Sequence, residues 1–285
     1  MTVGDLIEQL AQRFAAAGLV FGHGTDDAWD EAVALVLGVT QLPDDRGVLQ
    51  QRLPPAVQQQ VERLAARRID ERIPLAYLLG SCRFAGRDFL IEPGVVIPRS
   101  PIGALLEARL APWLEGEPQR IVDLCCGSGC LGIIAALAFP HAQVDLVDLD
   151  QTALGLARRN VALHGLEARV RVQQSDLFDD LPQADEPAGT WDLIVTNPPY
   201  VDRADMSSLP AEYRHEPALG LAGGADGLDL VARMLEALPQ RLAPGGTFVC
   251  EVGASAPALL RRFPCQPFIW PDLPHGGEGV FILFG

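Results

Sequence analysis

Apolar residues in the first seventy positions recur with the period of a helix. Leu6, Leu10 and Phe14, for example, are spaced i, i+4 and i+8 behind Thr2, a residue type that caps helices. The pattern predicts three helices, over residues 2–18, 25–38 and 55–72. The last of these should turn its apolar positions inward and three arginines to solvent, Arg63, Arg67 and Arg68.

Beyond residue 75 the pattern becomes that of strands. Residues 75–98 contain β-forming residues interrupted by glycines, which predicts a hairpin linker. Apolar strands then alternate with helices, and two further apolar strands are expected in a terminal hairpin over 267–285. This order is typical of a doubly wound, mostly parallel α/β sheet with one antiparallel strand. The other expected strands cover residues 120–124, 143–148, 168–174, 191–196 and 246–252.

These patterns divide the chain into three parts. Residues 1–74 form an expected helical domain without a catalytic signature, which favours a role in recognition. Residues 75–98 form the linker, and residues 99–285 form the expected α/β domain.

Composition narrows the class of protein. With 48% hydrophobic and 21% charged residues, the 285-residue chain is expected to be a soluble globular protein without a membrane span. Its N-terminus lacks the basic and apolar blocks of a signal peptide, so a cytoplasmic location is expected. The six cysteines form no C-x-x-C pair, which favours free thiols over zinc or disulfides, and no metal site is expected.

The charge balance is strongly negative. The formal net charge is −15, and all 22 basic residues are arginines. The absence of lysine excludes Schiff-base chemistry and a phosphate-loop lysine. An acidic surface repels nucleic acid and attracts a basic partner.

A glycine-rich loop supplies the first candidate site. Gly127, Gly129 and Gly132 form G-x-G-x-x-G directly after an expected strand and at the start of a helix. Such a loop lets a ligand approach the backbone at the helix N-terminus. Asp148 ends the next strand, where its carboxylate could accept both hydroxyl groups of a ribose. This pattern alone fits a nicotinamide or flavin dinucleotide as well as a nucleoside cofactor.

Asp123 favours S-adenosylmethionine among these ligands. A carboxylate beside the loop is a poor neighbour for a pyrophosphate, whereas S-adenosylmethionine carries an ammonium group and no phosphate. Asp176 and Leu177 follow the third strand of the sheet, where an adenine would lie. Their carboxylate and apolar side chain could contact the exocyclic amine and the ring.

The second candidate site is Asn197-Pro198-Pro199-Tyr200, at the end of the fourth strand. The two prolines stiffen the turn, so that the Pro198 carbonyl is free to accept a hydrogen bond. This carbonyl and the Asn197 amide oxygen could hold both N–H groups of a planar NH2, on which Tyr200 could stack.

These motifs resemble class I S-adenosylmethionine-dependent methyltransferases that modify amino or amide nitrogens. The segments 76–86, 96–107 and 201–230 are similar to those of the protein glutamine N5-methyltransferases, so that the resemblance covers nearly the whole chain. PRSP at 98–101 and YRHEP at 213–217 resemble the branch that modifies a large-subunit ribosomal protein.

The resemblance implies a Rossmann-like seven-stranded methyltransferase sheet, S-adenosylmethionine as cofactor and a basic ribosomal protein as substrate, free or in an assembly particle. The enzyme would contact nucleic acid only indirectly, through the RNA of that particle. The implied catalytic residues are Asn197, Pro198 and Tyr200, and the implied cofactor-binding residues are Asp123, Cys125, Gly127, Gly129, Asp148, Asp176, Leu177 and Asn197. The implied substrate-binding residues are Asn197, Pro198, Pro199, Tyr200, Arg99 and Arg214. The pair Cys125-Cys126 departs from the family, whose loop usually has small or hydroxylated residues there.

Other functions remain open at this point. The related branch that acts on peptide chain release factors shares the glutamine chemistry. A nucleic-acid amino methyltransferase would use the same NPPY turn, since adenine N6 has the same NH2 geometry. A nicotinamide-dependent oxidoreductase fits the glycine loop alone, and a non-catalytic binding module would not need the NPPY turn.

Overall fold

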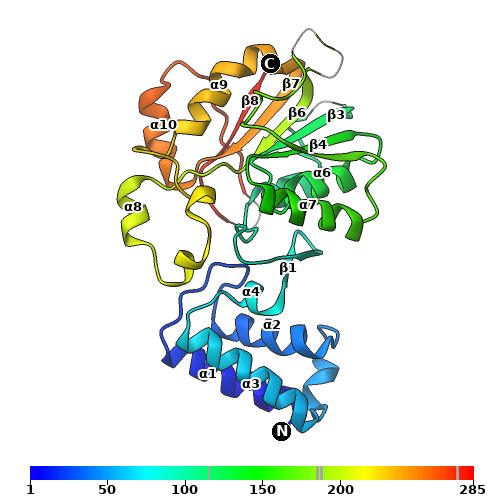
Figure 1. The fold of residues 1–285 in the computed structure, drawn as a ribbon, viewed down its shortest axis with the longest axis vertical. Coiled ribbons are helices and arrows are strands. Elements are labelled where there is room, and N and C mark those ends of the chain that lie inside the picture. The colour runs from blue at the N-terminus through cyan, green and yellow to red at the C-terminus, as the bar shows by residue number, and fades with distance from the viewer. Residues whose placement is uncertain (115, 184–185, 187–188, 274–275) are drawn as a thin grey trace.

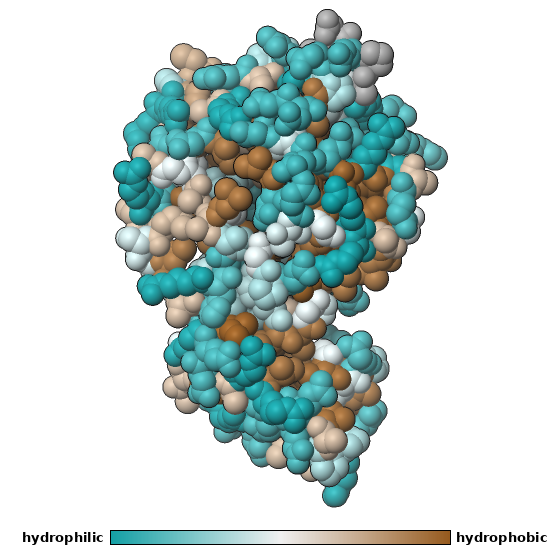
Figure 2. Space-filling model, in the orientation of Figure 1, coloured by the Kyte–Doolittle hydropathy of each residue, from teal (hydrophilic) through white to brown (hydrophobic). Residues whose placement is uncertain are grey.

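The protein is elongated, with a helical part at one end and an α/β part at the other (Figure 1). The computed structural model describes residues 1–114, 116–183, 186, 189–273 and 276–285. The outline narrows to a waist where the two ends meet (Figure 2). Among the described residues, every helix is too short or too polar to span a bilayer.

Three helices make up the N-terminal part. Thr2 caps the first in a capping box with Asp5, in which each side chain accepts a hydrogen bond from the other residue's backbone N–H. The helices enclose their own apolar cluster, to which Leu6, Leu35 and Val61 belong. Their bounds are α1 Val3–Ala16, α2 Ala28–Thr40 and α3 Pro55–Asp70.

Two details of these helices differ from the sequence-based expectation. α2 begins after Asp27, whose carboxylate accepts from two N–H groups of the first turn, and it continues past Gly38 to Thr40. The prediction that Arg68 faces solvent was wrong, because only 1% of this residue is exposed. Its guanidinium pairs with the buried carboxylates of Glu31 and Glu212, and these charges compensate one another away from water.

The segment between the two parts contains a short helix and a hairpin. α4 (Leu75–Leu79) follows Pro74, where strand was expected. β1 (Ser81–Phe84) and β2 (Arg87–Leu90) then pair antiparallel. The domain boundaries at 74/75 and 98/99 stay a prediction.

The described sheet of the C-terminal part has the order β5-β4-β3-β6-β7-β8, parallel except for β8. Two apolar clusters cover its two faces, one containing residues of α6 and α7, the other residues of α9. The strands are β3 Arg120–Leu124, β4 Gln143–Asp148, β5 Val170–Gln174, β6 Trp191–Thr196, β7 Leu242–Glu251 and β8 Val280–Phe284. The helices are α5 Ile102–Glu107, α6 Cys130–Ala138, α7 Gln151–Leu163, α8 Arg203–Ser208, α9 Asp229–Arg241 and α10 Ala256–Arg262.

The α/β class and the parallel-dominated sheet are confirmed, but the described residues contain six strands of this sheet rather than seven. The expected seventh strand is one bridge, in which Ile269 and Ile282 exchange both backbone hydrogen bonds. In an antiparallel ladder the next donors would be residues 267 and 271, and both are prolines without an N–H. Pro274 and His275 of the expected terminal turn lie outside the described residues.

The strand order determines where a ligand can bind. From β3 the chain proceeds to β4 and β5 on one side, and to β6 and β7 on the other. The carboxyl ends of β3 and β6 therefore flank the point where the order reverses, which is the usual ligand-binding crevice of open α/β sheets.

Candidate active site

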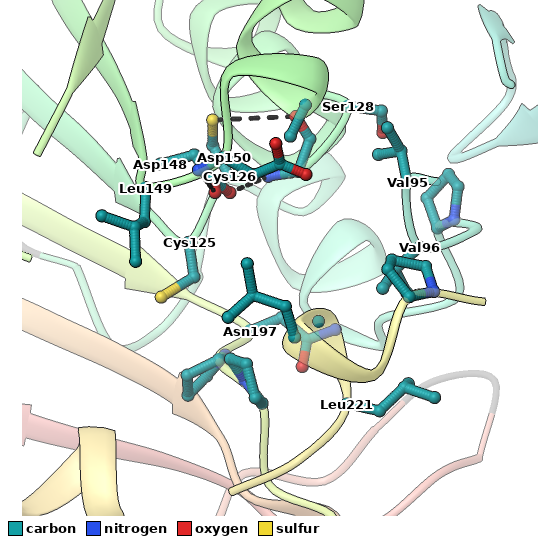
Figure 3. Close-up of a pocket in the computed structure, with 18 of the residues that line it drawn as sticks. Val95, Val96, Cys125, Cys126, Ser128, Asp148, Leu149, Asp150, Asn197 and Leu221 are labelled. Atoms are coloured by element: carbon teal, nitrogen blue, oxygen red, sulfur yellow. Dashed lines mark hydrogen bonds between the residues drawn. The ribbon is translucent and has the colours of Figure 1, made fainter. Parts of the chain in front are cut away.

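A cavity of about 470 Å³ lies at this crevice (Figure 3). It is lined by residues that follow β3, β4, β5 and β6, by the segment 94–100 and by the loop 209–221. Thr196 joins β6 to β3 at this edge, because its hydroxyl donates to the Leu124 carbonyl over 2.8 Å. The cavity brings together all of the site residues implied from the sequence except Gly129 and Arg214, which do not line it.

The glycine loop passes directly from β3 into α6. Gly127 and Gly129 have positive φ angles of 54° and 81°. A Cβ at Gly132 would lie 2.1 Å from Leu146 Cδ2 and 3.0 Å from Asp123 Cβ. Side chains are therefore excluded where the loop packs on the sheet, and its backbone is exposed to the cavity.

Asp148 fixes this loop to the end of β4. Its Oδ2 accepts from the Gly127 N–H over 2.8 Å, and its Oδ1 accepts from the Asp150 N–H over 2.9 Å. Burial raises the pKa of Asp148, while these backbone donors oppose the shift. Each carboxylate oxygen keeps a second lone pair for a ligand hydroxyl.

Asp123 lies deeper than the sequence suggested. It is a residue of β3 with 1% exposure, not a residue at the lip of the loop. Its Oδ2 accepts from the Gly132 N–H over 2.8 Å, and its buried Oδ1 has no partner in the described structure. Burial raises the pKa of Asp123 to about 8. A cationic group in the cavity would satisfy this oxygen and compensate its charge.

The two residues expected near an adenine also line the cavity. Leu177 is buried and has a φ of 55°. Asp176 forms an ion pair with Arg233 across 2.8 Å, so its carboxylate is shared with that arginine.

Cys125 and Cys126 occupy the start of the loop. Cys125 has a φ of 56°, a conformation that costs a non-glycine residue about 1–2 kcal/mol. Burial raises the pKa of both thiols, so neither has the low pKa of a reactive cysteine. All six cysteines are free. Among the described residues, no group of three or more His, Cys, Asp or Glu is arranged to hold a metal ion.

The NPPY turn closes the cavity opposite the glycine loop. Asn197 Oδ1 is buried without a partner in the described structure, and the residue faces the cavity (Figure 3). Pro198, Pro199 and Tyr200 line the same cavity. The Tyr200 hydroxyl donates to Glu251 Oε1 over 2.7 Å.

Arg99 and Arg214 have different surroundings. Arg99 lines the cavity, and its guanidinium binds both oxygens of Glu216 at 2.7 and 2.8 Å. Burial alone would raise the pKa of Glu216, but contacts with His23 and Arg99 outweigh it and lower this pKa to about 2. Arg214 is exposed, donates to the Leu209 carbonyl and does not line the cavity.

Two functional acids were not singled out individually from the sequence. Glu216 was considered only as part of the YRHEP cluster, and it is the anchor of Arg99. Glu251 is the last residue of the apolar strand β7 and is buried. Its charge within an apolar strand is the one sequence signal that could have marked it as a candidate site residue. The Glu216 carboxylate binds Arg99, which is 117 positions away, and the Glu251 carboxylate binds Ser100, which is 151 positions away. Local spacing in the sequence cannot show such contacts.

Known proteins share this fold. Residues 104–212 match the family model described as the methyltransferase small domain. The structure superposes with a TM-score of 0.51 on the hMettl16 catalytic domain in complex with MAT2A 3'UTR hairpin 1. That structure is 15% identical, with 86% of this chain and 85% of that chain covered, so it shows a shared fold.

The fold and the cavity thus define an S-adenosylmethionine-dependent methyltransferase of the Rossmann-like class. A ribosomal protein uL3 glutamine methyltransferase of Bordetella pertussis (strain Tohama I) is 46% identical over 99% of this chain and 94% of that protein. A protein of the same name from Burkholderia pseudomallei (strain K96243) is 42% identical with the same coverage. The chain belongs to the family of the ribosomal protein uL3 glutamine methyltransferases.

The cavity suits this cofactor on two structural grounds. Gly127, which has no side chain, lines the cavity beside the carboxylate of Asp148 and leaves room there for a ribose. The unpartnered Oδ1 of Asp123 is an acceptor that an ammonium group, such as that of S-adenosylmethionine, would satisfy.

Proposed function

We propose that this enzyme transfers a methyl group from S-adenosylmethionine to the side-chain amide nitrogen of a glutamine in ribosomal protein uL3. The observation that carries the proposal is the buried, unpartnered amide oxygen of Asn197, which lies in the same cavity as the glycine loop. An acceptor placed in this way favours binding of a hydrogen-bond donor in the cavity, since an unsatisfied buried polar group is costly. The names of the two bacterial relatives supply the target.

The cofactor would contribute an electrophilic methyl group on a sulfonium. We assign Asp123 to its ammonium group and Asp148 to its ribose hydroxyls, for the reasons of charge and geometry given above. Leu177 would cover the adenine ring, and Asp176 would accept from its exocyclic amine. The backbone of Gly127, together with Cys125 and Asn197, would complete the pocket, and Gly129 would support the loop as the N-cap of α6.

The substrate amide would be held by the NPPY turn. Asn197 Oδ1 and the Pro198 carbonyl would each accept one amide N–H, with Pro199 keeping the turn rigid and Tyr200 stacked on the planar group. An amide nitrogen is a weak nucleophile because its lone pair is delocalised into the carbonyl. Alignment of reacting groups supplies about 7–11 kcal/mol in favourable systems. Acceptors that bind the nitrogen more tightly as positive charge develops would lower the barrier further.

The rest of the substrate would meet the surface around the cavity. Residues 1–74 are proposed as the recognition domain, with Arg99 on the cavity wall and Arg214 outside it. A net charge of −15 favours encounter with a basic protein, either free or in an early assembly particle. We place the reaction in the cytoplasm, where such a particle would be assembled, with RNA met only through the particle.

A labelled-methyl transfer assay tests the proposal. Purified enzyme is given S-adenosylmethionine with a labelled methyl group and uL3, a peptide chain release factor or ribosomal RNA in parallel. We expect uL3 to be labelled at the highest rate. Faster labelling of the release factor would reassign the enzyme to the related branch, and labelling of RNA alone would refute a protein substrate.

A further inference from the structure

Tyr200 of the NPPY turn is shared between two cavities. A second cavity of about 520 Å³ lies beside the first, and Phe84, Arg99, Ser100 and Tyr200 line both. Glu251 lines only the second cavity. A residue in this position can act on the proposed reaction only through the groups of the shared wall.

Glu251 makes hydrogen bonds to two residues of that wall. Its Oε1 accepts from the Tyr200 hydroxyl over 2.7 Å, and its Oε2 accepts from the Ser100 hydroxyl over 2.5 Å. The residue is 5% exposed, and burial raises its pKa. Ser100 in turn accepts from the Ile102 N–H at the start of α5. One carboxyl group therefore joins the NPPY turn to the segment that precedes α5.

The sheet register explains why a residue of β7 reaches the turn. Cys250 pairs with Thr196, so Glu251 is level with the first residue of the NPPY turn, at the same edge of the sheet. Two further residues lie against Tyr200, Gly253 at its ring and Ser255 at its backbone carbonyl. A Cβ at Gly253 would lie 2.6 Å from Tyr200 Cε2, and the Ser255 hydroxyl donates to the Tyr200 carbonyl over 3.0 Å.

We propose that Glu251 is a positioning residue, which fixes the ring of Tyr200 relative to the cavity wall by accepting the hydrogen bonds of Tyr200 and Ser100. This proposal rests on the proposed function, because it assigns the oriented ring to the binding of the substrate amide. Without the carboxyl group, the tyrosine hydroxyl loses its acceptor and the ring its alignment. Misplacement by about 1 Å at a reacting group can reduce a rate about a hundredfold.

The first experiment observes Tyr200 without any substrate. The chain has three tyrosines, so labelled tyrosine gives few ring resonances in NMR spectra, and Tyr200→Phe identifies the one that belongs to Tyr200. We expect Glu251→Ala to shift this resonance and to increase exchange of the ring between orientations. Glu251→Gln keeps one strong acceptor and should cause a smaller change. An unchanged Tyr200 resonance in both variants would overturn the proposal.

The second experiment measures catalysis with uL3. We expect Glu251→Ala to lower kcat about ten- to a hundredfold while the dissociation constant for S-adenosylmethionine changes less than about twofold. Glu251→Gln should recover part of the rate. In the double variant with Tyr200→Phe, the losses should not multiply, because both changes remove the same contact.

The matched control is Asp145→Asn. Asp145 is also a buried acid of the central sheet, it accepts from Trp191 Nε1 over 2.9 Å, and it does not line either cavity. We expect this variant to lose stability but to keep kcat. Equal losses of kcat in Asp145→Asn and Glu251→Ala would show a merely structural effect and overturn the proposal. If the wild-type enzyme does not methylate uL3, the proposed function fails, whereas the Tyr200 resonance still decides whether Glu251 holds the ring.

Discussion

The two halves of the active-site cavity are built in different ways. What we call the cofactor half is the proposed cofactor site at residues 123–150 and 175–177, and what we call the substrate half is the proposed substrate site at residues 97–100 and 197–221. The cofactor half comes mostly from one strand–loop–helix–strand unit, in which Asp148 binds the loop through the Gly127 N–H. The substrate half is held by side chains from distant segments, such as the pair Arg99–Glu216.

The N-terminal helices take part in the second arrangement. Arg68 of α3 joins Glu31 of α2 to Glu212 of the loop, and Glu212 also accepts from the Val20 N–H over 3.1 Å. His215 of the same loop contacts the Glu71 carbonyl across 2.9 Å. If the N-terminal part is the recognition domain that we propose, its connection to the cavity wall lets it influence the shape of the cavity as well as the capture of the substrate.

The largest effect is expected where this connection is broken. Arg68→Met leaves the buried Glu31 without its cation and leaves Glu212 with only the partly exposed Arg72. The loss of one partner of a buried pair costs about 3–5 kcal/mol. Urea denaturation should therefore show a large loss of unfolding free energy, and methylation of uL3 should decrease more than cofactor affinity.

Arg67→Met is the matched control for Arg68→Met. Arg67 is half exposed and pairs with Glu71 at i,i+4, an interaction worth about 0.3–0.5 kcal/mol. We expect it to change stability by no more than that. Similar losses in the two variants would mean that the buried charges do not hold the substrate half together.

The next largest effect is expected on the rate of methyl transfer. Asn197→Ala removes the unpartnered acceptor and should lower kcat on the order of 10²–10³, as the loss of a preorganised hydrogen-bonding group does elsewhere. Calorimetry should show nearly unchanged affinity for S-adenosylmethionine. Near-normal turnover in a folded Asn197→Ala enzyme would make the NPPY turn purely structural.

A change in the cofactor half should instead weaken the binding of S-adenosylmethionine. Asp148→Ala removes a charged acceptor for the ribose hydroxyls, and a hydrogen bond to a charged group is worth about 1.5–3 kcal/mol. We expect S-adenosylmethionine to bind roughly ten- to a hundredfold more weakly in calorimetry. Asp179→Ala is the control, since Asp179 is exposed and does not line the cavity. Equal affinity in wild type and Asp148→Ala would remove this residue from the cofactor site.

The smallest effect comes from the backbone of the glycine loop. Cys125→Gly relieves the positive φ angle, which costs about 1–2 kcal/mol, but adds about 0.5–1 kcal/mol of unfolded-state entropy. The net expectation in thermal or urea unfolding is a gain of about 0.5–1 kcal/mol. Cys126→Gly should destabilise instead, because Cys126 is buried and its φ is not positive. A loss of stability in both variants would show that the Cys125 side chain outweighs its backbone strain.

The same difference between the halves explains what the sequence could predict. G-x-G-x-x-G, Asp148 and the NPPY turn are encoded by short spacings and strand ends. Gly127 of the glycine motif, Asp148 and the NPPY turn line one cavity as expected. Helical periodicity predicts that a charged residue such as Arg68 faces solvent. In the structure, carboxylates from two other segments, Glu31 and Glu212, pair with Arg68 and allow it to be buried. The hydrogen-bonding partners of Glu251 and Glu216 are equally long-range, so their roles became visible only in the structure.

The most direct test of the account is the location of the transferred methyl group. Purified uL3 is incubated with S-adenosylmethionine and either the wild-type enzyme or Asn197→Ala, and its peptides are then fragmented by tandem mass spectrometry. The account predicts one added methyl group on the side-chain amide nitrogen of a single glutamine, formed by the wild-type enzyme and almost absent with Asn197→Ala. Methylation of a different residue type, or an equal yield from both enzymes, would contradict it.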